Sequence, residues 1–434
     1  MRCSRQVSVL LALVLCATGL RAQDRPHVFR GATIYPVSGP PIENGVLVIH
    51  QGKIVAVGPA NRVSIPRGAV ELDVRGKVII PGLVDTHSHI GGGDGGDRSA
   101  TLHPEVRILD AIDPQHDTFW KARAGGITTM NIMPGSGHLM SGQTVYVKPR
   151  MARTIQEMLF CQDPLREVCG GMKMANGTNS LGNPPSPGTR AKSAALVRQL
   201  FLKAVEYREK IRQAQGDPAK MPARDLQMEA LVEILEGKRI VHFHTHRHDD
   251  ILTAIRLGQE FGFRPVLHHV SEAWKVADEI ARARVPCSII VLDSPGGKHE
   301  AVDIRWENGA ALEKAGVDVA FHTDDGITDS RLFLRSAALG IRAGMSRQKA
   351  LEALTLAGAR MLGLENRIGS LDPGKDADFV VLSGDPFSVY THVEQTWIDG
   401  RKVFDRANPE HRKYATGGYG VYRGDVYGHD EGEE

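Results

Sequence analysis

Short apolar runs separated by glycine-containing turns occupy the first part of the chain, a pattern typical of β-strands. Such runs stand at 46–49, 54–57 and 78–80, and each follows a turn that contains a glycine. Three similar runs return between residues 378 and 404. Neither segment offers enough strands to bury a core alone. We therefore expect both segments to join in one small sheet domain, with the central region inserted between them.

The central region alternates apolar strands with stretches of helical apolar spacing, which favours parallel strands joined by helices. The first strand leads into residues 81–89. The other expected strands lie at 127–133, 144–147, 171–175, 239–246, 265–270, 287–292 and 318–323. Eight strand–helix units fit a (β/α)8 barrel, in which functional sites lie at the carboxyl ends of the strands.

Two histidines stand at the end of the first of these strands. The apolar run 78–80 continues into the stretch PGLVDTHSH at residues 81–89, and we interpret the whole as one buried strand. Because side chains alternate along a strand, His87 and His89 point the same way. Two converging imidazoles can hold one metal ion, such as zinc. The three glycines at 91–93 leave this site open.

Later strands end in further groups that bind metals or transfer protons. The fifth strand carries His242, His244 and His246 on one face, and only those nearest its end can reach a shared metal. We expect His242 to be a buried histidine satisfied by hydrogen bonds. The eighth strand ends in Asp324 and Asp325, and a slip of one residue decides which carboxylate faces the site.

The fourth strand contains a lysine among apolar residues. Burying an unpaired ammonium is costly, so Lys173 needs either a functional partner or a path to solvent. The sixth strand ends in His268 and His269, followed by Glu272. For Glu272 we weigh a structural role near a helix start against a functional one.

The stretch at 81–89 resembles the first-strand signature of the amidohydrolase superfamily, most closely its imidazolonepropionase-like and Xaa-dipeptidase-like members. Several motifs recur in order along nearly the whole chain. The resemblance implies an α/β fold with a (β/α)8 TIM barrel at 81–366. It also implies a small composite β-sandwich domain built from residues 23–80 and 367–406.

The resemblance further implies roles for individual residues. The expected metal ligands come from five strand ends: His87, His89, Lys173, His244, His269 and Asp324. In relatives a lysine at this position is carboxylated and bridges two metals, so we expect one or two divalent ions. Asp324 is the expected proton shuttle, with Asp325 as the alternative. His269 is a ligand or a catalytic histidine, His268 is expected to point away, and His246 binds substrate or supports a ligand.

Two loops offer further candidates for substrate binding. His138 lies in a glycine-rich loop after the second strand, where the backbone can approach a substrate closely. Arg190 follows a proline-rich loop after the fourth strand and could bind a substrate carboxylate. An ordinary surface arginine is the equal alternative.

Composition limits the class of partner. The chain has 434 residues, 53 Lys and Arg against 51 Asp and Glu, and a formal net charge of +2. No charged field favours nucleic acid or an anionic membrane. The expected partner is a small-molecule amide, cyclic amide or dipeptide. Assembly into a homo-oligomer is a further possibility.

The N-terminus reads as a secretory signal peptide at 1–22, with Arg2 and Arg5 before an apolar run. Cleavage after Ala22 would give an exported protein, periplasmic or extracellular; lipid attachment at Cys16 is the alternative. In an exported protein Cys161 and Cys169 are close enough to pair, whereas Cys287 stands in an apolar strand. We expect a flexible C-terminal tail at 407–434.

These features predict a metal-dependent hydrolase of amide or cyclic-amide carbon–nitrogen bonds. A metal lowers the pKa of its bound water towards ~7, and Asp324 would act as general base and then general acid. Two alternatives stand beside this prediction. One is a deaminase of an amino-heterocycle on the same site, and the other is a barrel without catalysis that serves only for binding.

Overall fold

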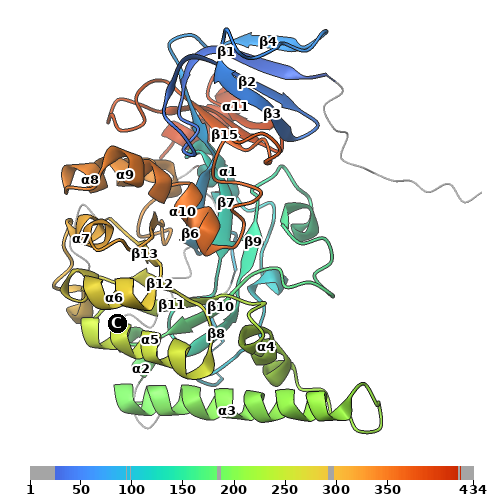
Figure 1. Ribbon diagram of the computed structural model, residues 1–434, viewed down its shortest axis with the longest axis vertical. Coiled ribbons are helices and arrows are strands. Elements are labelled where there is room, and N and C mark those ends of the chain that lie inside the picture. Colours follow the sequence, from blue (N-terminus) through green and yellow to red (C-terminus); the bar gives the residue numbers. More distant parts are fainter. Residues whose placement is uncertain are drawn as a thin grey trace, which may run out of the picture.

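A computed structural model describes residues 25–93, 95–97, 99–182, 187–291, 298–418 and 421. The predicted signal peptide lies outside these residues. The described chain forms a sheet-rich part at one end and a larger α/β part that carries most of the helices (Figure 1). Among the described residues, none of the helices combines the length and the apolarity that a membrane crossing needs.

The sheet-rich part is one eight-stranded sheet made from both ends of the chain. Its path runs β17-β16-β15-β5-β1-β2-β3, and β4 pairs with β1. The N-terminal and C-terminal strands meet where β5 pairs antiparallel with β15, as the sequence pattern predicts. The strands are β1 (His27–Ile34), β2 (Ile42–His50), β3 (Lys53–Pro59), β4 (Val70–Asp73), β5 (Val78–Pro81), β15 (Phe379–Leu382), β16 (Val393–Ile398) and β17 (Arg401–Asp405).

The larger part contains two further sheets. A six-stranded sheet has the order β14-β13-β12-β11-β10-β8, and a three-stranded sheet has the order β6-β7-β9. Their strands are β6 (Leu83–Ser88), β7 (Ile127–Ile132), β8 (Met140–Gln143), β9 (Val145–Val147), β10 (Met172–Ala175), β11 (Val241–Thr245), β12 (Pro265–His269), β13 (Cys287–Ile289) and β14 (Val319–Phe321). All eight expected strand positions therefore hold a strand, and β8 is an addition.

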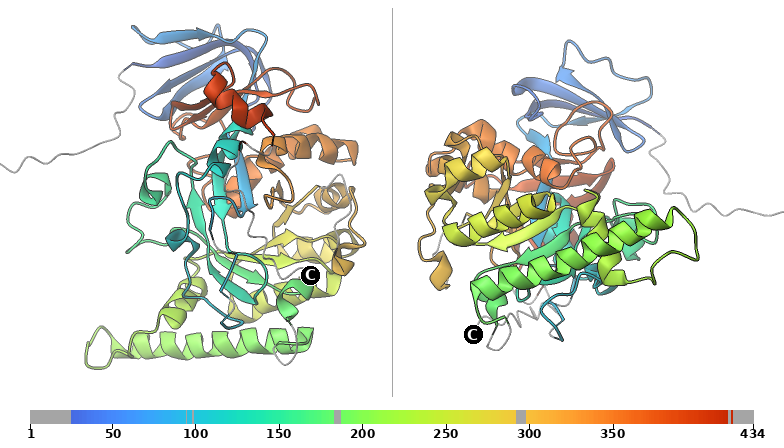
Figure 2. Two further views of the ribbon diagram at one scale, coloured as in Figure 1. Left: turned by 180° about the vertical axis from the view of Figure 1, so that it is seen from behind. Right: turned by 60° about the horizontal axis from the view of Figure 1, so that its bottom comes forward.

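Helices pack around these sheets, as the view from behind also shows (Figure 2). The longest, α3, lies along the edge of the molecule far from the eight-stranded sheet (Figure 1). The α-helices are α1 (Thr118–Ala124), α2 (Thr178–Leu181), α3 (Arg190–Ala214), α4 (Leu226–Leu235), α5 (His248–Phe261), α6 (Ala277–Ala283), α7 (Asn308–Lys314), α8 (Arg335–Arg342), α9 (Arg347–Ala353), α10 (Leu356–Met361) and α11 (Pro409–Thr416). Short 3-10 turns lie at Ile108–Asp110, Ile155–Met158, Ala273–Lys275, His299–Ala301 and Ser330–Leu332.

The predicted first strand is in fact two strands with different partners. β5 belongs to the eight-stranded sheet, whereas β6, which carries His87, pairs with β7 in the three-stranded sheet. Gly82 stands between them, and a Cβ there would lie 2.0 Å from the Thr128 hydroxyl oxygen. The glycine therefore allows the chain to pass closely over β7 as it leaves one sheet for the other.

The prediction of uniformly parallel strands fails at the third strand. β9 pairs antiparallel with β7, and β8 pairs antiparallel with β10. A parallel pair needs a crossover connection, usually a helix, and the segment between β7 and β9 contains no helix among the described residues. The later strands β10 to β14 are parallel, as expected.

Three local predictions can also be compared with the structure. Cys161 and Cys169 form a disulfide, and Cys287 is a free, buried cysteine in β13. The expected C-terminal tail is helical in its first part, because α11 packs its Tyr414 ring flat on Trp120 of α1, with ring centroids 5.1 Å apart. Most of the remaining tail lies outside the described residues.

A buried ion cluster joins the two parts of the molecule. The Lys148 ammonium, directly after β9, is fully buried and lies 2.8 Å from carboxylate oxygens of Asp376 and Asp378 and 2.5 Å from one of Asp399. The three aspartates flank β15 and β16 in the eight-stranded sheet. Burial lowers the pKa of Lys148, but the three carboxylates outweigh this and hold the pKa above its usual value. The lysine therefore stays charged and ties the sheets together.

Replacing Lys148 with Met should destabilise the protein by about 3–5 kcal/mol, because it leaves buried carboxylates without their counter-charge. Denaturant unfolding would measure this loss. Arg30→Met, which removes the exposed ion pair between Arg30 and Glu71, is the matched control and should change stability little. Equal stability of Lys148→Met and the native protein would contradict the role of this cluster.

Candidate metal centre

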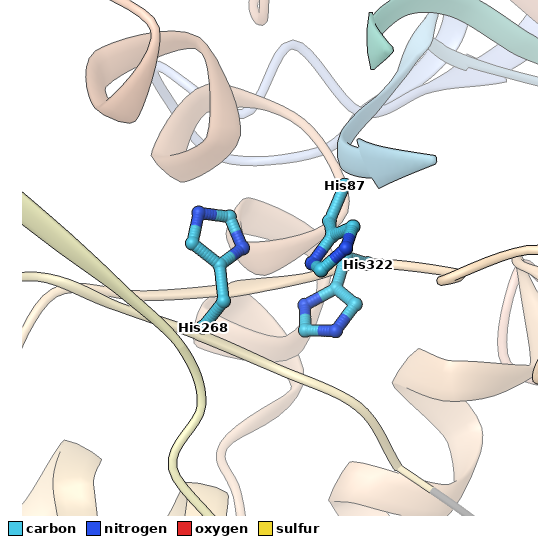
Figure 3. A group of neighbouring side chains, drawn as sticks. All are labelled: His87, His268 and His322. Carbon is cyan, nitrogen blue, oxygen red and sulfur yellow. The ribbon is translucent and has the colours of Figure 1, made fainter. Parts of the chain in front are cut away.

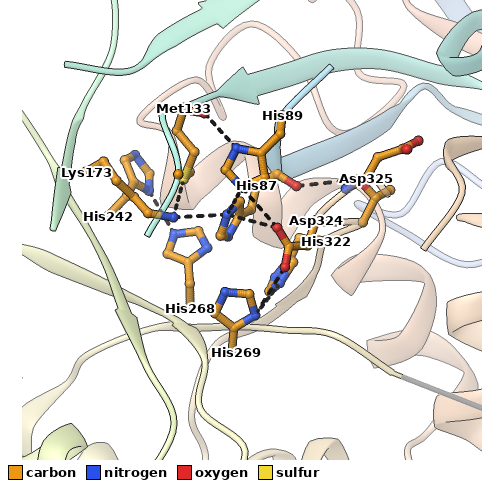
Figure 4. A network of polar contacts seen from close by, with 12 residues as sticks. His87, His89, Met133, Lys173, His242, His268, His269, His322, Asp324 and Asp325 are labelled. Carbon is orange, nitrogen blue, oxygen red and sulfur yellow. Dashed lines mark hydrogen bonds and ion pairs between the residues drawn. The ribbon is translucent and has the colours of Figure 1, made fainter. Parts of the chain in front are cut away.

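Buried imidazoles gather where the strands of the α/β part end (Figure 4). Strand alternation brings them there: in β11, His242 and His244 face inward while Phe243 packs on the helices outside. The inward-facing set draws on β6, β11, β12, β14 and the segments directly after them. Its members are His87, His89, His242, His244, His246, His268, His269 and His322.

The first potential metal group joins His87, His89 and Asp324. The Asp324 carboxylate lies 3.1 Å from His89 Nε2 and 3.4 Å from His87 Nε2. Asp324 has a φ of 47°, a left-handed conformation that is costly for a residue other than glycine. Its backbone N–H donates to the His87 carbonyl over 2.9 Å. These contacts point the carboxylate at the two histidines.

The second potential group joins His244, His246 and His269, whose rings lie 4.5–4.9 Å apart. His246 lies just past the end of β11 and its Nδ1 is 2.7 Å from the Ser271 hydroxyl. The side chain of His269 also approaches Asp324, with Nδ1 3.9 Å from a carboxylate oxygen. The two groups thus share one polar interior.

A third group lies beside the first and contains His87, His268 and His322 (Figure 3). The expectation that His268 points away is wrong, because its ring centroid lies 5.0 Å from that of His87. The chain turns through positive φ at His269 and Val270 as β12 ends, so simple strand alternation does not separate His268 from His269. Neither His268 nor His322 was predicted as a site residue; the recurrence of histidines at the ends of β6, β11, β12 and β14 was the available signal.

His242 has the structural role expected of it. It is fully buried, its Nε2 lies 2.8 Å from the Tyr146 hydroxyl, and its Nδ1 lies 3.0 Å from His268 Nε2. Both of its ring nitrogens therefore have hydrogen-bond partners within the protein.

Lys173 projects from β10 into the histidine cluster (Figure 4). Its side chain is fully buried, and Nζ lies 3.0 Å from His87 Nε2 and 3.1 Å from the Met133 sulfur. The structure therefore brings the lysine to the first metal group and excludes a surface lysine.

Burial sets the protonation of the cluster. It lowers the pKa of His87, His244, His268 and His269 well below the usual value, and neighbouring cationic groups lower it further. Burial raises the pKa of Asp324, but the hydrogen bond and charge of His89 outweigh it, so that this pKa is low. Neutral imidazoles and an ionised carboxylate are the forms that bind a metal ion.

Unsatisfied nitrogen atoms show that the cluster fits a cation. Among the described residues, neither ring nitrogen of His244 has a hydrogen-bond partner, and the same holds for His87 Nδ1, His246 Nε2 and His268 Nδ1. Buried polar atoms without partners are rare in native proteins and call for an explanation such as an ion or a water. Imidazole nitrogens together with a carboxylate suit zinc and similar ions.

Other candidate residues lie away from this cluster. Asp325 accepts from the buried Lys121 ammonium over 2.7 Å and from Ser330, so it braces the loop instead of facing the histidines. Arg190 forms an ion pair with Asp250 over 2.8 Å, beside a cavity between α3 and α5. His138 packs against the ring of His103.

Of the two roles considered for Glu272, structural and functional, its contacts support the structural one. Its carboxylate accepts from the backbone N–H of His248, 3.0 Å away at the start of α5, and from the ring of the same residue. Asp249 and Asp250 lie within the first turn of this helix.

Comparison with known proteins places the chain in a family. The amidohydrolase family pattern Amidohydro_3 matches residues 201–404. A crystal structure of an amidohydrolase from Thermotoga maritima MSB8 is 35% identical, with a TM-score of 0.82 over 88% of this chain and 100% of that chain. This similarity implies a TIM-barrel-like α/β fold with a separate domain.

Curated relatives are more distant. Amidohydrolase tasK of Hapsidospora irregularis is 28% identical over 88% of this chain, which spans only 43% of that protein. A 5-methylthioadenosine/S-adenosylhomocysteine deaminase of Symbiobacterium thermophilum is 24% identical over 87% of this chain and 93% of its own length. The imidazolonepropionase of Rhizobium rhizogenes is 24% identical over 82% and 91%.

The resemblance stated from residues 81–89 is therefore confirmed, because a relative above 30% identity is matched over its full length and the others carry related names. The histidine and aspartate groups at the strand ends agree with the metal dependence of such enzymes. The chain belongs to the amidohydrolase superfamily of hydrolases that act on carbon–nitrogen bonds, among its imidazolonepropionase-like members.

Proposed function

We propose that this protein is a metal-dependent amidohydrolase that cleaves an amide or cyclic-amide carbon–nitrogen bond in a small molecule. One observation carries the proposal: His87, His89 and Asp324 converge at strand ends beside a fully buried Lys173. A cyclic amide such as an imidazolone ring, or a dipeptide, is the substrate class that the site and the family favour.

The proposed ligands of a divalent ion, zinc in the first instance, are His87, His89, His244, His269 and Asp324, with Lys173 as a bridge if it is carboxylated. A bound ion would act as a Lewis acid and would make water a nucleophile at neutral pH. The short distances among His87, His89 and Asp324 suit one ion at the first group, and a second ion would fit among His244, His246 and His269.

The chain's own groups would handle the protons. Asp324 is ionised at neutral pH, because its pKa is low, and its carboxylate can accept a proton and return it to the leaving nitrogen. His269 lies 3.9 Å from that carboxylate and is placed to hydrogen-bond a substrate carbonyl. His246 keeps a buried Nε2 free of hydrogen bonds within the described residues, so it can meet a substrate directly.

Two structural expectations belong to the same proposal. We infer that the two sheets of the α/β part close into one (β/α)8 barrel within residues 81–366, because Asp324 after β14 bonds to His87 of β6. The composite domain would take 23–80 and 367–406. His138 and Arg190 are the further candidates for substrate binding, and Arg190 would first have to leave its ion pair with Asp250.

A deaminase is the second candidate, since one relative that matches over most of its length carries that name. Hydrolysis of an amino-heterocycle would release ammonia without ring opening. A barrel used only for binding is disfavoured by the intact set of histidines and Asp324. Screening the metal-loaded protein against dipeptides, cyclic amides and amino-heterocycles separates the three: cleavage or ring opening supports the proposal, ammonia alone supports deamination, and no turnover favours binding.

Metal content is the first test. Protein purified without chelators should contain at least one divalent ion per chain by elemental analysis. His244→Ala should lower that content, because it removes a ring with two unpaired buried nitrogens, whereas His411→Ala in α11 should not. Full hydrolase activity in a metal-free protein would sink the proposal.

Asp324→Asn keeps the volume of the side chain but removes the base. It should reduce kcat by roughly 10²–10⁴-fold, the range typical of general acid–base residues. Asp325→Asn, the neighbouring control, should weaken the buried pair with Lys121 and lower thermal stability, with a much milder effect on kcat. Reversed kinetic effects would show that Asp325 is the proton shuttle.

Lys173→Ala tests the carboxylated lysine. The variant should lose metal and activity together, and a short carboxylic acid such as acetate should restore part of both by replacing the bridge. The same acid should leave the native protein unchanged. Unaltered metal stoichiometry and turnover in Lys173→Ala would leave a site with one ion and no bridging lysine.

Export is proposed from the sequence alone. The precursor should be cut after Ala22, and N-terminal sequencing of material recovered from the periplasm or the medium would measure the cleavage point. A mature chain that begins with a lipid-modified Cys16 would contradict this proposal.

A further inference from the structure

The first metal group spans a junction between two sheets that are not joined by strand pairing in the described part of the chain. His87 and His89 belong to β6 and the residues after it, in the three-stranded sheet, whereas Asp324 follows β14, the end strand of the six-stranded sheet. Among the described residues, one backbone hydrogen bond joins these two segments, from Asp324 N–H to the His87 carbonyl. Other contacts must therefore fix the distance between the histidines and the carboxylate.

Asp85 provides two such contacts. Its carboxylate is fully buried in β6, two residues before His87, and crosses the junction to Thr323. One oxygen accepts from the Thr323 hydroxyl over 2.6 Å, and the other accepts from the Thr323 backbone N–H over 3.0 Å. The same carboxylate accepts from the His87 N–H over 3.3 Å. A single side chain thus binds the residue before Asp324 and the backbone of a candidate ligand.

The Thr323 hydroxyl extends this contact around the turn. It donates to Asp85 and accepts from the Asp325 N–H over 3.1 Å. Asp324 lies between two residues held in this way, and it is the one with the left-handed backbone. Such a conformation costs of order 1–3 kcal/mol and persists only when its surroundings determine it.

We propose that Asp85 is a positioning residue, which through Thr323 holds Asp324 in its left-handed conformation against His87 and His89. The carboxylate replaces the strand pairing that is absent at the junction. Its kinetic consequence rests on the proposed function, whereas its structural consequence does not.

Asn at position 85 would match the carboxylate in size but not in hydrogen bonding. Its amide oxygen can still accept one hydrogen, while its NH₂ group faces the Thr323 hydroxyl. The Thr323 hydroxyl would then have to accept from the amide while it already accepts from the Asp325 N–H. Its own proton would no longer have a carboxylate oxygen as acceptor. The turn that presents Asp324 would therefore loosen.

The test compares Asp85→Asn, Thr323→Val and the double variant with Thr323→Ser and Thr396→Val. The first two should lower kcat about 10–100-fold, the range for groups that orient metal ligands, with KM little changed. The double variant should be no slower than either single variant, because both remove one interaction. Thr323→Ser keeps the hydroxyl and should retain activity.

Thr396→Val is the matched control, since it removes a buried hydrogen bond of β16, from the Thr396 hydroxyl to the Arg123 carbonyl over 2.7 Å, without touching the turn or the histidine cluster. It should cost stability and leave kcat unchanged. An equal kcat loss in Thr396→Val, or native kcat in a folded Asp85→Asn, would overturn the inference.

A second readout does not need a substrate. In protein loaded with Co²⁺, the visible absorption of the ion reports its ligand geometry, and Asp85→Asn and Thr323→Val should alter it in the same way. Spectra unchanged by both variants would overturn the inference. Altered spectra in a protein without hydrolase activity would support the positioning role and contradict the proposed function.

Discussion

The structure depends on keeping a group of uncharged imidazoles buried in its interior. Each buried ring needs a partner for its nitrogens, because an unsatisfied polar atom costs free energy that packing does not return. Some rings find partners in the protein, as His242 does with Tyr146 and His268. Others, His244 above all, have none among the described residues. The short strands, the inward-facing lysine and the strained turn at Asp324 are all arranged around that polar interior.

Much of this arrangement could be predicted from strand periodicity. Apolar runs that end in His or Asp located the strands that carry the candidate histidine and aspartate ligands. Alternation placed His87 on the same face as His89, and it placed His242 deeper than the strand end. Asp324 was separated from Asp325 by a motif resemblance, and the contact of Asp325 with Lys121 agrees with that choice.

The features missed were those that depend on departures from regular geometry. His268 lies beside the inward-facing His244 in the register of β11 and β12, and His269 joins it in the cluster because the backbone turns left-handed at His269 and Val270. The strand through residues 78–88 divides at Gly82 because Thr128 approaches there. β9 reverses its direction because the chain before it is too short to hold a crossover helix. Propensity and spacing describe average strands, so none of these three could be read from the pattern.

The pairing of β5 with β15 has a consequence for the order of biosynthesis. Ile80 lies opposite Val380, so the partner of an early strand leaves the ribosome only after the whole inserted region has been made. Contacts so far apart in sequence close slowly, and an unpaired strand edge is a template for association with other chains. During that interval the edge of β5 is the place where a nascent chain of this protein is most open to aggregation. The late strand β15 therefore also protects the edge of β5 from pairing with other chains.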